Sequence, residues 1–252
     1  MYKSVIIDCL PEQASKYGTD WAIVAIDVIR ATTTAITAVA DGRRCFPAPT
    51  VEAAFEIARG LDRPILAGEN GGTIPDGFEM DNSPAEVFSR PDTGRPLVLV
   101  SSSGTRLIHE AALCARTYIA CFRCHTATAR LLAGRYARIA LIGAGTKGEF
   151  REEDQICCAW IGAALMDRGY APANVRTMKI IDRWRGAPAD ACLSSRSVEY
   201  LRRSGKICDL NFILSHVDDI DQLFEVRGGE VRGLSAARQG TLSTCSPAVS
   251  TV

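Results

Sequence analysis

Short apolar stretches that alternate with longer amphipathic ones are the feature that most restricts how this chain can fold. Residues 21–27 (WAIVAID), 96–100 (PLVLV) and 136–143 (YARIALIG) have the continuous apolar character of buried strands. Each is followed by small or hydroxyl residues and then by a helical pattern. Strands that alternate with helices form parallel βαβ units, with helices on both faces of the sheet. The sequence therefore predicts an α/β fold.

The same criteria place further elements along the chain. We expect strands at residues 4–10, 44–49, 64–69 and 117–122, helices at 31–42, 50–61, 106–115, 124–134, 152–169 and 195–204, a weak strand at 175–181 and a hairpin at 223–234. A length of 252 residues suits one α/β unit, so a single domain over residues 1–252 is expected. Roughly the last 12 residues have the composition of a flexible tail.

Charge and hydropathy exclude several classes of partner. Lys plus Arg and Asp plus Glu each number 29, so no overall field favours nucleic acid or an anionic membrane. No apolar run reaches the roughly 20 residues that a membrane span needs. The first residues also lack the apolar region of a signal peptide. We therefore expect a cytoplasmic protein without nucleic-acid or membrane partners, in which any anion is bound by local groups.

The ten cysteines are expected to be reduced and mostly buried in that compartment. The stretch CFRCH, with Cys121, Cys124 and His125, formally matches a haem-attachment signal or half of a zinc site. The missing export signal argues against haem, and the missing second spaced pair argues against zinc. Core or loop cysteines are the favoured interpretation, and none of the three histidines is assigned a role.

Three strand-to-helix junctions share one design, at residues 27–34, 101–105 and 143–154. Ligands of open α/β sheets bind outside the carboxyl ends of the strands, where such loops gather. The three junctions are therefore expected to face one site. The Gly- and Pro-bearing loop at residues 70–84 is long for a compact domain, and long ordered loops are more often functional than incidental.

The segment DVIRATTT carries the most specific signal. Asp27 stands where a buried strand ends, and a carboxylate there needs a cation, which is either Arg30 or a metal. One interpretation is a structural Asp27–Arg30 pair with threonines capping a helix. The other, which we favour, is a site for a metal and an anion. The turn SSSGT suits an anion at a helix N-terminus, although an ordinary Ser/Thr cap explains it equally well.

The segment GAGTKG satisfies the G-x-G-x-x-G pattern of dinucleotide-binding turns. Acidic residues crowd the start of the following helix, where a pyrophosphate would be repelled: Glu149, Glu152, Glu153 and Asp154. Such carboxylates suit Mg²⁺ better, although one or two of them could simply complement a helix dipole. An NAD-linked enzyme is therefore the least favoured interpretation.

Four segments together resemble the 2-phosphosulfolactate phosphatase family: IDVIRATTTAITAVADG, AGENGGTIPDGFEMDNSP, VLVSSSGTRLI and GAGTKGEFREEDQICCAWI. They occur in the order and at the spacing of that family. The resemblance implies a three-layer α/β/α fold with a mixed, mostly parallel sheet. It also implies Mg²⁺-dependent hydrolysis of a phosphate monoester of a small anionic 2-hydroxy acid, a step toward coenzyme M in the archetype. The positions carried over are Asp27, Arg30, Thr32, Thr33, Thr34, Glu69, Asn82, Ser83, Gly104, Thr105, Glu153 and Asp154.

Departures from the family pattern bear on the substrate. Asn70 stands where the family usually has arginine, Asp81 where it has glycine, Ser103 where it commonly has asparagine, and Ser197 where a histidine often lies. Loss of an arginine and gain of an aspartate make the pocket less cationic. The chemistry therefore carries over better than the identity of the substrate.

The resulting hypothesis assigns a role to each group. Asp27, Glu69, Glu153 and Asp154 are candidate Mg²⁺ ligands, and Arg30 clamps the phosphate. The nucleophile is either a metal-activated water or an aspartyl carboxylate, and water is preferred. Hydrogen bonds to the phosphoryl group are expected from Thr32, Thr33, Thr34, Ser102, Ser103, Gly104 and Thr105, with Asn82 and Ser83 also binding substrate. The alternative is a non-catalytic binder of a small phosphorylated or carboxylated metabolite. Assembly as a homodimer is expected only because homodimers are the commonest oligomers of soluble proteins.

Overall fold

The computed structural model describes residues 2–146 and 148–235, and the expected flexible tail lies outside them. Within these ranges one mixed, mostly parallel sheet has the order β4-β5-β3-β10-β9-β6-β2-β7-β1-β8. The strands are β1 Ser4–Cys9, β2 Ala22–Ile26, β3 Cys45–Ala48, β4 Ile65–Gly68, β5 Leu97–Val100, β6 Arg116–Ala120, β7 Arg138–Gly143, β8 Ala171–Pro172, β9 Leu223–Arg227 and β10 Glu230–Leu234. The expected fold class is confirmed.

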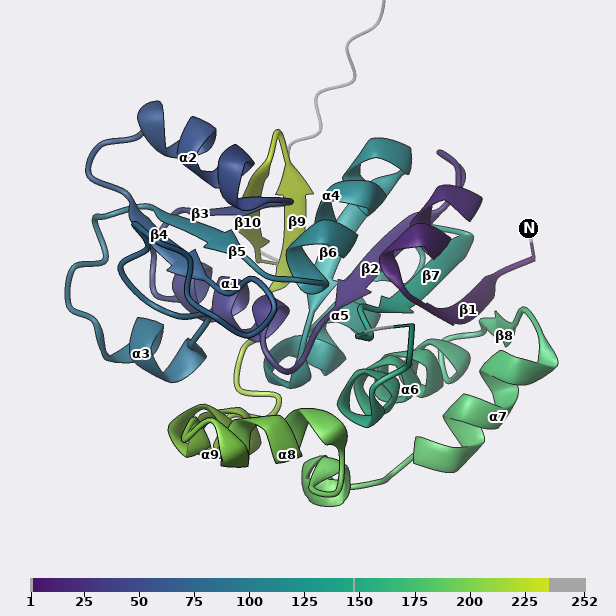
Figure 1. Cartoon of the computed structure of the whole chain (residues 1–252). Helices are drawn as coiled ribbons and strands as arrows, with labels where there is room; N and C mark the ends of the chain where they lie inside the picture. The colour runs from purple at the N-terminus through teal and green to yellow at the C-terminus, as the bar shows by residue number, and fades with distance from the viewer. Residues whose placement is uncertain (1, 147, 236–252) are drawn as a thin grey trace, which may run out of the picture.

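Helices cover both faces of the sheet, which gives the three layers. Figure 1 shows α2 and α4 on one side of the sheet and α5, α6 and α7 on the other, while α1 packs against α3 and α3 against α9. The helices are α1 Ala31–Ala40, α2 Val51–Arg59, α3 Pro84–Ser89, α4 Gly104–Cys114, α5 His125–Leu132, α6 Glu152–Met166, α7 Val175–Trp184, α8 Arg196–Arg203 and α9 Ile207–Ser215, with short 3₁₀ turns at Pro11–Lys16, Phe122–Cys124 and Ala189–Cys192. None of these helices is long and apolar enough to cross a bilayer.

The C-terminal hairpin lies in the middle of the sheet and reverses its direction. β10 pairs antiparallel with β3 and with β9, and β9 pairs antiparallel with β6. Three successive antiparallel pairings make β3, β4 and β5 run opposite to β6, β2, β7 and β1. In Figure 1, β5 approaches the centre from the left and β2 approaches it from the right. The carboxyl ends of both halves therefore meet near the centre of the molecule.

The core is built around β2, whose five residues are all fully buried. Its neighbours β6 and β7 run parallel to it, and both faces of the strand are covered. A strand buried on both faces needs the continuous apolar sequence seen here, because no side chain reaches water. Small residues let α1 lie against this centre, and eight of its ten residues are buried.

The expected strand at 175–181 is wrong, since these residues belong to α7. Asn174 caps the helix by accepting a hydrogen bond from the backbone N–H of Thr177 at 2.8 Å. Thr177, Ile181 and Trp184 recur at helical spacing and are the buried residues of α7. The β-branched residues of the segment favoured a strand, but the cap and this buried face decide the structure.

The cysteines of the CFRCH stretch are core residues, as the sequence favoured. Cys121 and Cys124 are fully buried, and no cysteine in the described part of the chain forms a disulfide. Burial raises the pKa of the Cys157 and Cys158 thiols in α6 well above its usual value. These groups are therefore protonated, apolar packing residues at neutral pH.

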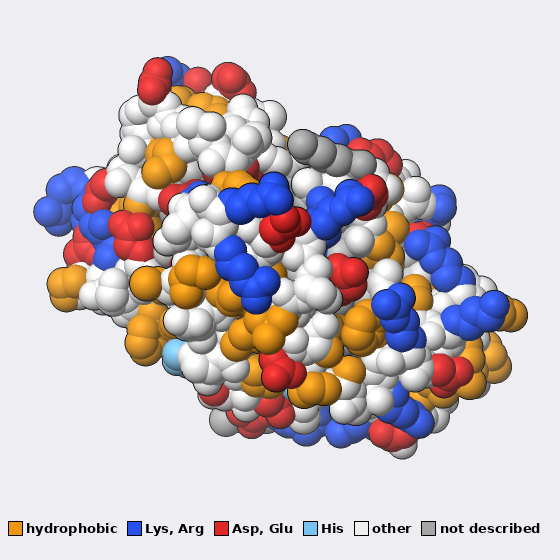
Figure 2. Space-filling view, turned by 60° about the horizontal axis from the view of Figure 1, so that its bottom comes forward, with side chains coloured by type: hydrophobic (Ala, Val, Ile, Leu, Met, Phe, Trp, Pro, Cys, Tyr) orange, Lys and Arg blue, Asp and Glu red, His pale blue; other side chains and the backbone are white. Residues whose placement is uncertain are grey.

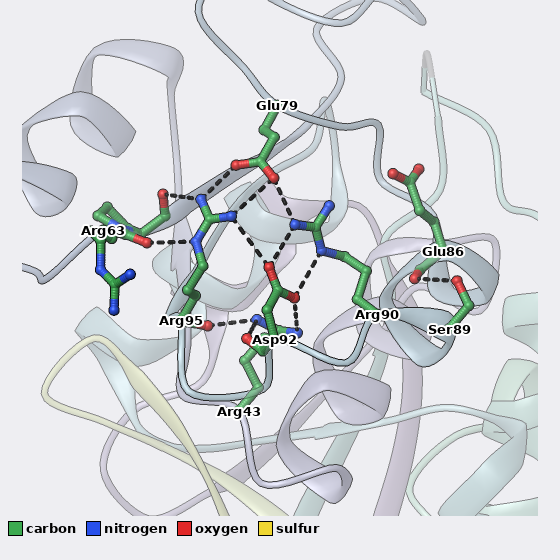
Figure 3. Close-up of polar contacts among 9 residues, drawn as sticks. Arg43, Arg63, Glu79, Glu86, Ser89, Arg90, Asp92 and Arg95 are labelled. Atoms are coloured by element: carbon green, nitrogen blue, oxygen red, sulfur yellow. Dashed lines mark hydrogen bonds and ion pairs between the residues drawn. The ribbon is translucent and has the colours of Figure 1, made fainter.

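A charged cluster fixes the segment between α3 and β5 to the start of β3 (Figure 3). Arg43 is buried and donates hydrogen bonds to the carbonyl oxygens of Asp92 and Arg95 and to the Asp92 carboxylate. Arg90 and Arg95 also contact that carboxylate, and both reach Glu79 on the exposed side. Hydrogen bonds, the strongest from Arg90, hold the pKa of Asp92 below its usual value.

Asp92→Asn should lower the free energy of unfolding by about 2–3 kcal/mol, because the buried Arg43 guanidinium loses its carboxylate. The depressed pKa means that this contribution is present above about pH 4 and is lost only at lower pH. Urea unfolding at about pH 5 and pH 7 should therefore give the same difference. The control Glu79→Gln, on the exposed side, should cost less than about 1 kcal/mol. If both variants lower the free energy of unfolding equally, the buried Arg43 guanidinium does not depend on the Asp92 carboxylate.

Candidate active site

The turn between β2 and α1 is held by buried threonines. The Thr32 hydroxyl lies 2.8 Å from the carbonyl oxygens of Asp27 and Ala120 and accepts a hydrogen bond from the Asp27 N–H. The hydroxyls of Thr33 and Thr34 donate to the carbonyls of Val28 and Arg30. All three side chains face backbone in the interior, so the prediction that they contact phosphate is corrected to a structural role in the turn.

Asp27 is enclosed where the N-termini of α1 and α4 meet. A Cβ at Gly104, the first residue of α4, would lie 2.0 Å from Oδ2 of Asp27. The backbone N–H of Ala31 favours the charged form of the same carboxylate and so acts to lower its pKa. Burial, reinforced by the charges of Glu69 and Glu153, raises the pKa of Asp27 to about 7. The carboxylate therefore lacks full compensation by the described part of the chain.

Asp154 and Glu153 lie behind Asp27, at the first turn of α6. Asp154 accepts hydrogen bonds from the N–H of Val28 at 2.9 Å and of Gly145 at 3.3 Å. It thereby ties the β2–α1 turn to the GAGTKG turn. Because Asp154 accepts the hydrogen bond of the Gly145 N–H, that donor is not available to the phosphate of a dinucleotide. Burial, with the charges of Asp27 and Glu153, raises the pKa of Asp154 well above its usual value.

Glu153 is almost completely buried and only partly satisfied. Burial raises the pKa of its carboxyl group above the usual value, and the nearby hydroxyls of Ser197 and Ser195 offset only part of this effect. Its Oε2 has no hydrogen-bond partner among the described residues. A buried carboxylate oxygen without a partner is costly and marks a place where a proton or a cation would be stabilised.

Glu69 and the SSSGT turn bind one another. The N–H and hydroxyl of Ser102 donate to Glu69 at 2.8 and 2.9 Å, and the N–H of Gly72 donates at 2.7 Å. Thr105 faces inward, where its hydroxyl bonds the backbone of Ser101. In the described structure, the N–H groups of Ser103 and Gly104 form no hydrogen bond. Both are unused donors at the start of α4, and Ser103 also lines the pocket described below.

Arg30 pairs with two carboxylates, and neither of them is Asp27. Its Nη1 lies 2.9 Å from Asp81 and 2.7 Å from Asp209, while Lys206 Nζ lies 2.6 Å from Asp81. The Ser83 hydroxyl also donates to Asp209, at 2.5 Å. The alternative of an Asp27–Arg30 pair is therefore wrong. Arg30 is also not free to clamp a phosphate in this structure, because Asp81 and Asp209 already compensate its charge.

A pocket of about 870 Å³ collects these groups. Of the predicted residues, six line it: Asp27, Arg30, Glu69, Asn82, Ser102 and Ser103. Glu153 and Asp154 are buried and do not line the pocket, and Gly104 lies against the Asp27 carboxylate. Thr32, Thr33, Thr34, Ser83 and Thr105 are engaged with neighbouring protein groups and do not line the pocket. All three predicted junctions thus reach one site.

Sequence reasoning missed the basic and aromatic part of the wall. The lining also includes Arg106, Arg151, Arg196 and Tyr200, together with Ser197, already noted in the sequence as a departure from the family pattern. On the molecular face formed by α8 and α9, Figure 2 shows Lys and Arg side chains interspersed with acidic ones near the centre. Arg151 lies next to the acidic run, within the fourth segment of the resemblance, which is the one signal that could have found it. Nothing in the sequence placed Tyr200 beside Gly72, whose carbonyl accepts a hydrogen bond from the Tyr200 hydroxyl.

The carboxylates do not form a closed metal cage. Within residues 2–146 and 148–235, no three His, Cys, Asp or Glu side chains converge as a ready-made ion site. Mg²⁺ is usually held by one or two carboxylates together with water and substrate phosphate. Asp27 and Glu69 on the wall, with the unpartnered Oε2 of Glu153 behind them, fit that kind of site.

Comparison with known proteins gives one consistent result. The family model described as 2-phosphosulpholactate phosphatase matches residues 8–228. The chain is 34% identical to a probable 2-phosphosulfolactate phosphatase of Symbiobacterium thermophilum over 228 residues, which cover 87% of this chain and 88% of that protein. It is also 34% identical to the Deinococcus radiodurans protein of that name, over 82% of this chain and 86% of that protein. A Clostridium perfringens relative of the same name is 27% identical over 83% and 87%.

Proposed function

This chain belongs to the 2-phosphosulfolactate phosphatase family, and we propose that it is a Mg²⁺-dependent hydrolase of the phosphate monoester of a small anionic 2-hydroxy acid. The observation that carries the proposal is the Asp27 carboxylate, buried against Gly104 beside two N–H donors at the start of α4 that form no hydrogen bond in the described structure. An acidic group that attracts a cation thus adjoins a helix end that attracts an anion. A phosphate with its Mg²⁺ requires both.

Asp27 and Glu69 are the residues proposed to hold the ion. When bound, Mg²⁺ neutralises charge on phosphate oxygens and orients an attacking water. The hydrogen bonds that Glu69 accepts from Ser102 and Gly72 fix the orientation of its carboxylate. Asp154 fixes the turn that carries Asp27. The pocket therefore presents carboxylates whose positions are set before any ligand arrives.

The chain's own donors are proposed to bind the phosphoryl group. The N–H groups of Ser103 and Gly104 lie at the N-terminal end of α4, and Ser103 lines the pocket. Such donors stabilise the negative charge of the transition state without reorganisation. Asn82 adds an amide whose buried Oδ1 has no partner among the described residues. That oxygen is available to accept a hydrogen bond from a substrate hydroxyl or bound water.

The test is phosphate release from a panel of small phosphate monoesters that includes 2-phosphosulfolactate and 2-phospholactate, with Mg²⁺ or with EDTA. We expect release that requires Mg²⁺ and is fastest for an ester that carries a further acidic group. A folded, metal-loaded protein that releases phosphate from none of them would contradict the phosphatase. That outcome would favour a binder of a phosphorylated or carboxylated metabolite.

A further inference from the structure

Among the described basic residues that line the pocket, Arg151 is the one whose charge is least compensated. Its side chain is only 12% exposed. Its Nε is buried and has no hydrogen-bond partner among the described residues. Its remaining contacts are long: Nη1 lies 3.5 Å from Glu149, and Nη2 lies 3.5 Å from the carbonyl of Thr146. A largely buried guanidinium with weak contacts is costly unless an anion completes its hydrogen bonds.

The other three pocket arginines have better partners. Arg30 contacts two carboxylates at less than 3 Å. Arg106 pairs with Glu12 at 2.9 Å near the surface. Arg196, which is 70% exposed, forms the closer of the two contacts to Glu149. The carboxylate that Arg151 reaches is therefore shared and is held mainly by its neighbour.

We propose that Arg151 is the specificity-determining residue that binds the carboxylate of the substrate. The inference rests on the proposed function and assigns the second anionic group of the ester to a named partner. Phosphate would be bound beside Asp27 and the start of α4, and the acid group would be bound at Arg151, which lines the same pocket just before α6. The planar guanidinium can bind a carboxylate through two parallel hydrogen bonds.

This arrangement also defines the substrate class. Because Asp81 and Asp209 already neutralise Arg30, the described residues of the pocket wall offer one under-compensated cation that is shielded from solvent. It therefore suits a phosphate monoester with one further acidic group close to the ester carbon. An ester with two further acids would have to place its second one against an arginine that is already paired.

The experiment compares 2-phospholactate with its carboxamide, which keeps the ester and the shape and loses the acid. Arg151→Gln should raise KM for 2-phospholactate about 10- to 100-fold, the range expected for charge-assisted hydrogen bonds. It should change kcat/KM for the carboxamide less than about twofold, and Arg151→Lys should recover only part of the loss. The control Arg203→Gln removes an exposed charge from α8 and should leave both substrates unaffected.

If Arg151→Gln lowers kcat/KM equally for 2-phospholactate and its carboxamide, or lowers it for neither, the assignment of Arg151 is overturned. Calorimetry with lactate separates this inference from the proposed function, because binding needs no turnover. If the wild type releases no phosphate but binds lactate more tightly than Arg151→Gln does, the phosphatase fails and the carboxylate site stands. Equal or undetectable lactate binding by both proteins would overturn the site as well.

Discussion

Asp27→Asn should reduce phosphate release at least about a thousandfold while the protein stays folded, because the group proposed to face the ion and the phosphate loses its charge. Asparagine keeps the shape of the side chain, so the space beside Gly104 stays filled. The decrease should appear in kcat at saturating Mg²⁺, and raising the Mg²⁺ concentration should not restore it.

The same substitution should not lower the free energy of unfolding measured in EDTA. Asp27 is a buried carboxylate whose charged form is disfavoured by burial and by Glu69 and Glu153. Removing a charge that the fold does not fully compensate is neutral or stabilising. A variant that is inactive because it is unfolded would show the opposite, and circular dichroism with urea titration separates the two cases. Wild-type activity in Asp27→Asn would remove Asp27 from the site.

Gly104→Ala should lower kcat about a hundredfold, since catalysis is sensitive to displacements of about 1 Å. The new Cβ would lie 2.0 Å from Asp27 Oδ2 and 2.7 Å from Ala31 Cβ, so the carboxylate or the start of α4 has to shift. Gly104 has no positive φ, so the effect comes from this close approach and not from backbone strain. Overpacking should also cost about 1–3 kcal/mol of stability.

The matched control is Gly18→Ala, at a glycine without positive φ whose added Cβ would meet nothing within 4 Å. Its kinetics and urea midpoint should match the wild type. Steady-state phosphate release and equilibrium unfolding on both variants give the comparison. If Gly104→Ala keeps full activity, Asp27 does not need its observed position, and the site geometry proposed here is wrong.

Much of the fold was readable because local pattern and burial agree. The continuous apolar run of β2 predicted a buried strand, and all five residues of that strand are fully buried. The direction reversal by β9 and β10 was not readable, because pairing partners far apart in the chain leave no local mark. α7 was missed for the opposite reason, since its β-branched residues indicated a strand more strongly than its cap indicated a helix.

The candidate site divides in the same way. The sequence located Asp27 at a strand end and Ser102 in a turn at a helix start, and the structure places both on one pocket wall. The partners of Arg30 could not be predicted, because Asp209 lies 179 residues away in the chain. The Thr32–Thr34 hydroxyls misled because side-chain bonds to local backbone and bonds to a ligand have the same sequence signature.

The measurement that tests the central claim most directly is a crystal structure of the protein grown with Mg²⁺ and inorganic phosphate. We predict phosphate bonded to the N–H groups of Ser103 and Gly104, with Mg²⁺ between it and the carboxylates of Asp27 and Glu69. Phosphate bound elsewhere, or a pocket left empty at saturating phosphate by a protein that hydrolyses the esters, would contradict the account.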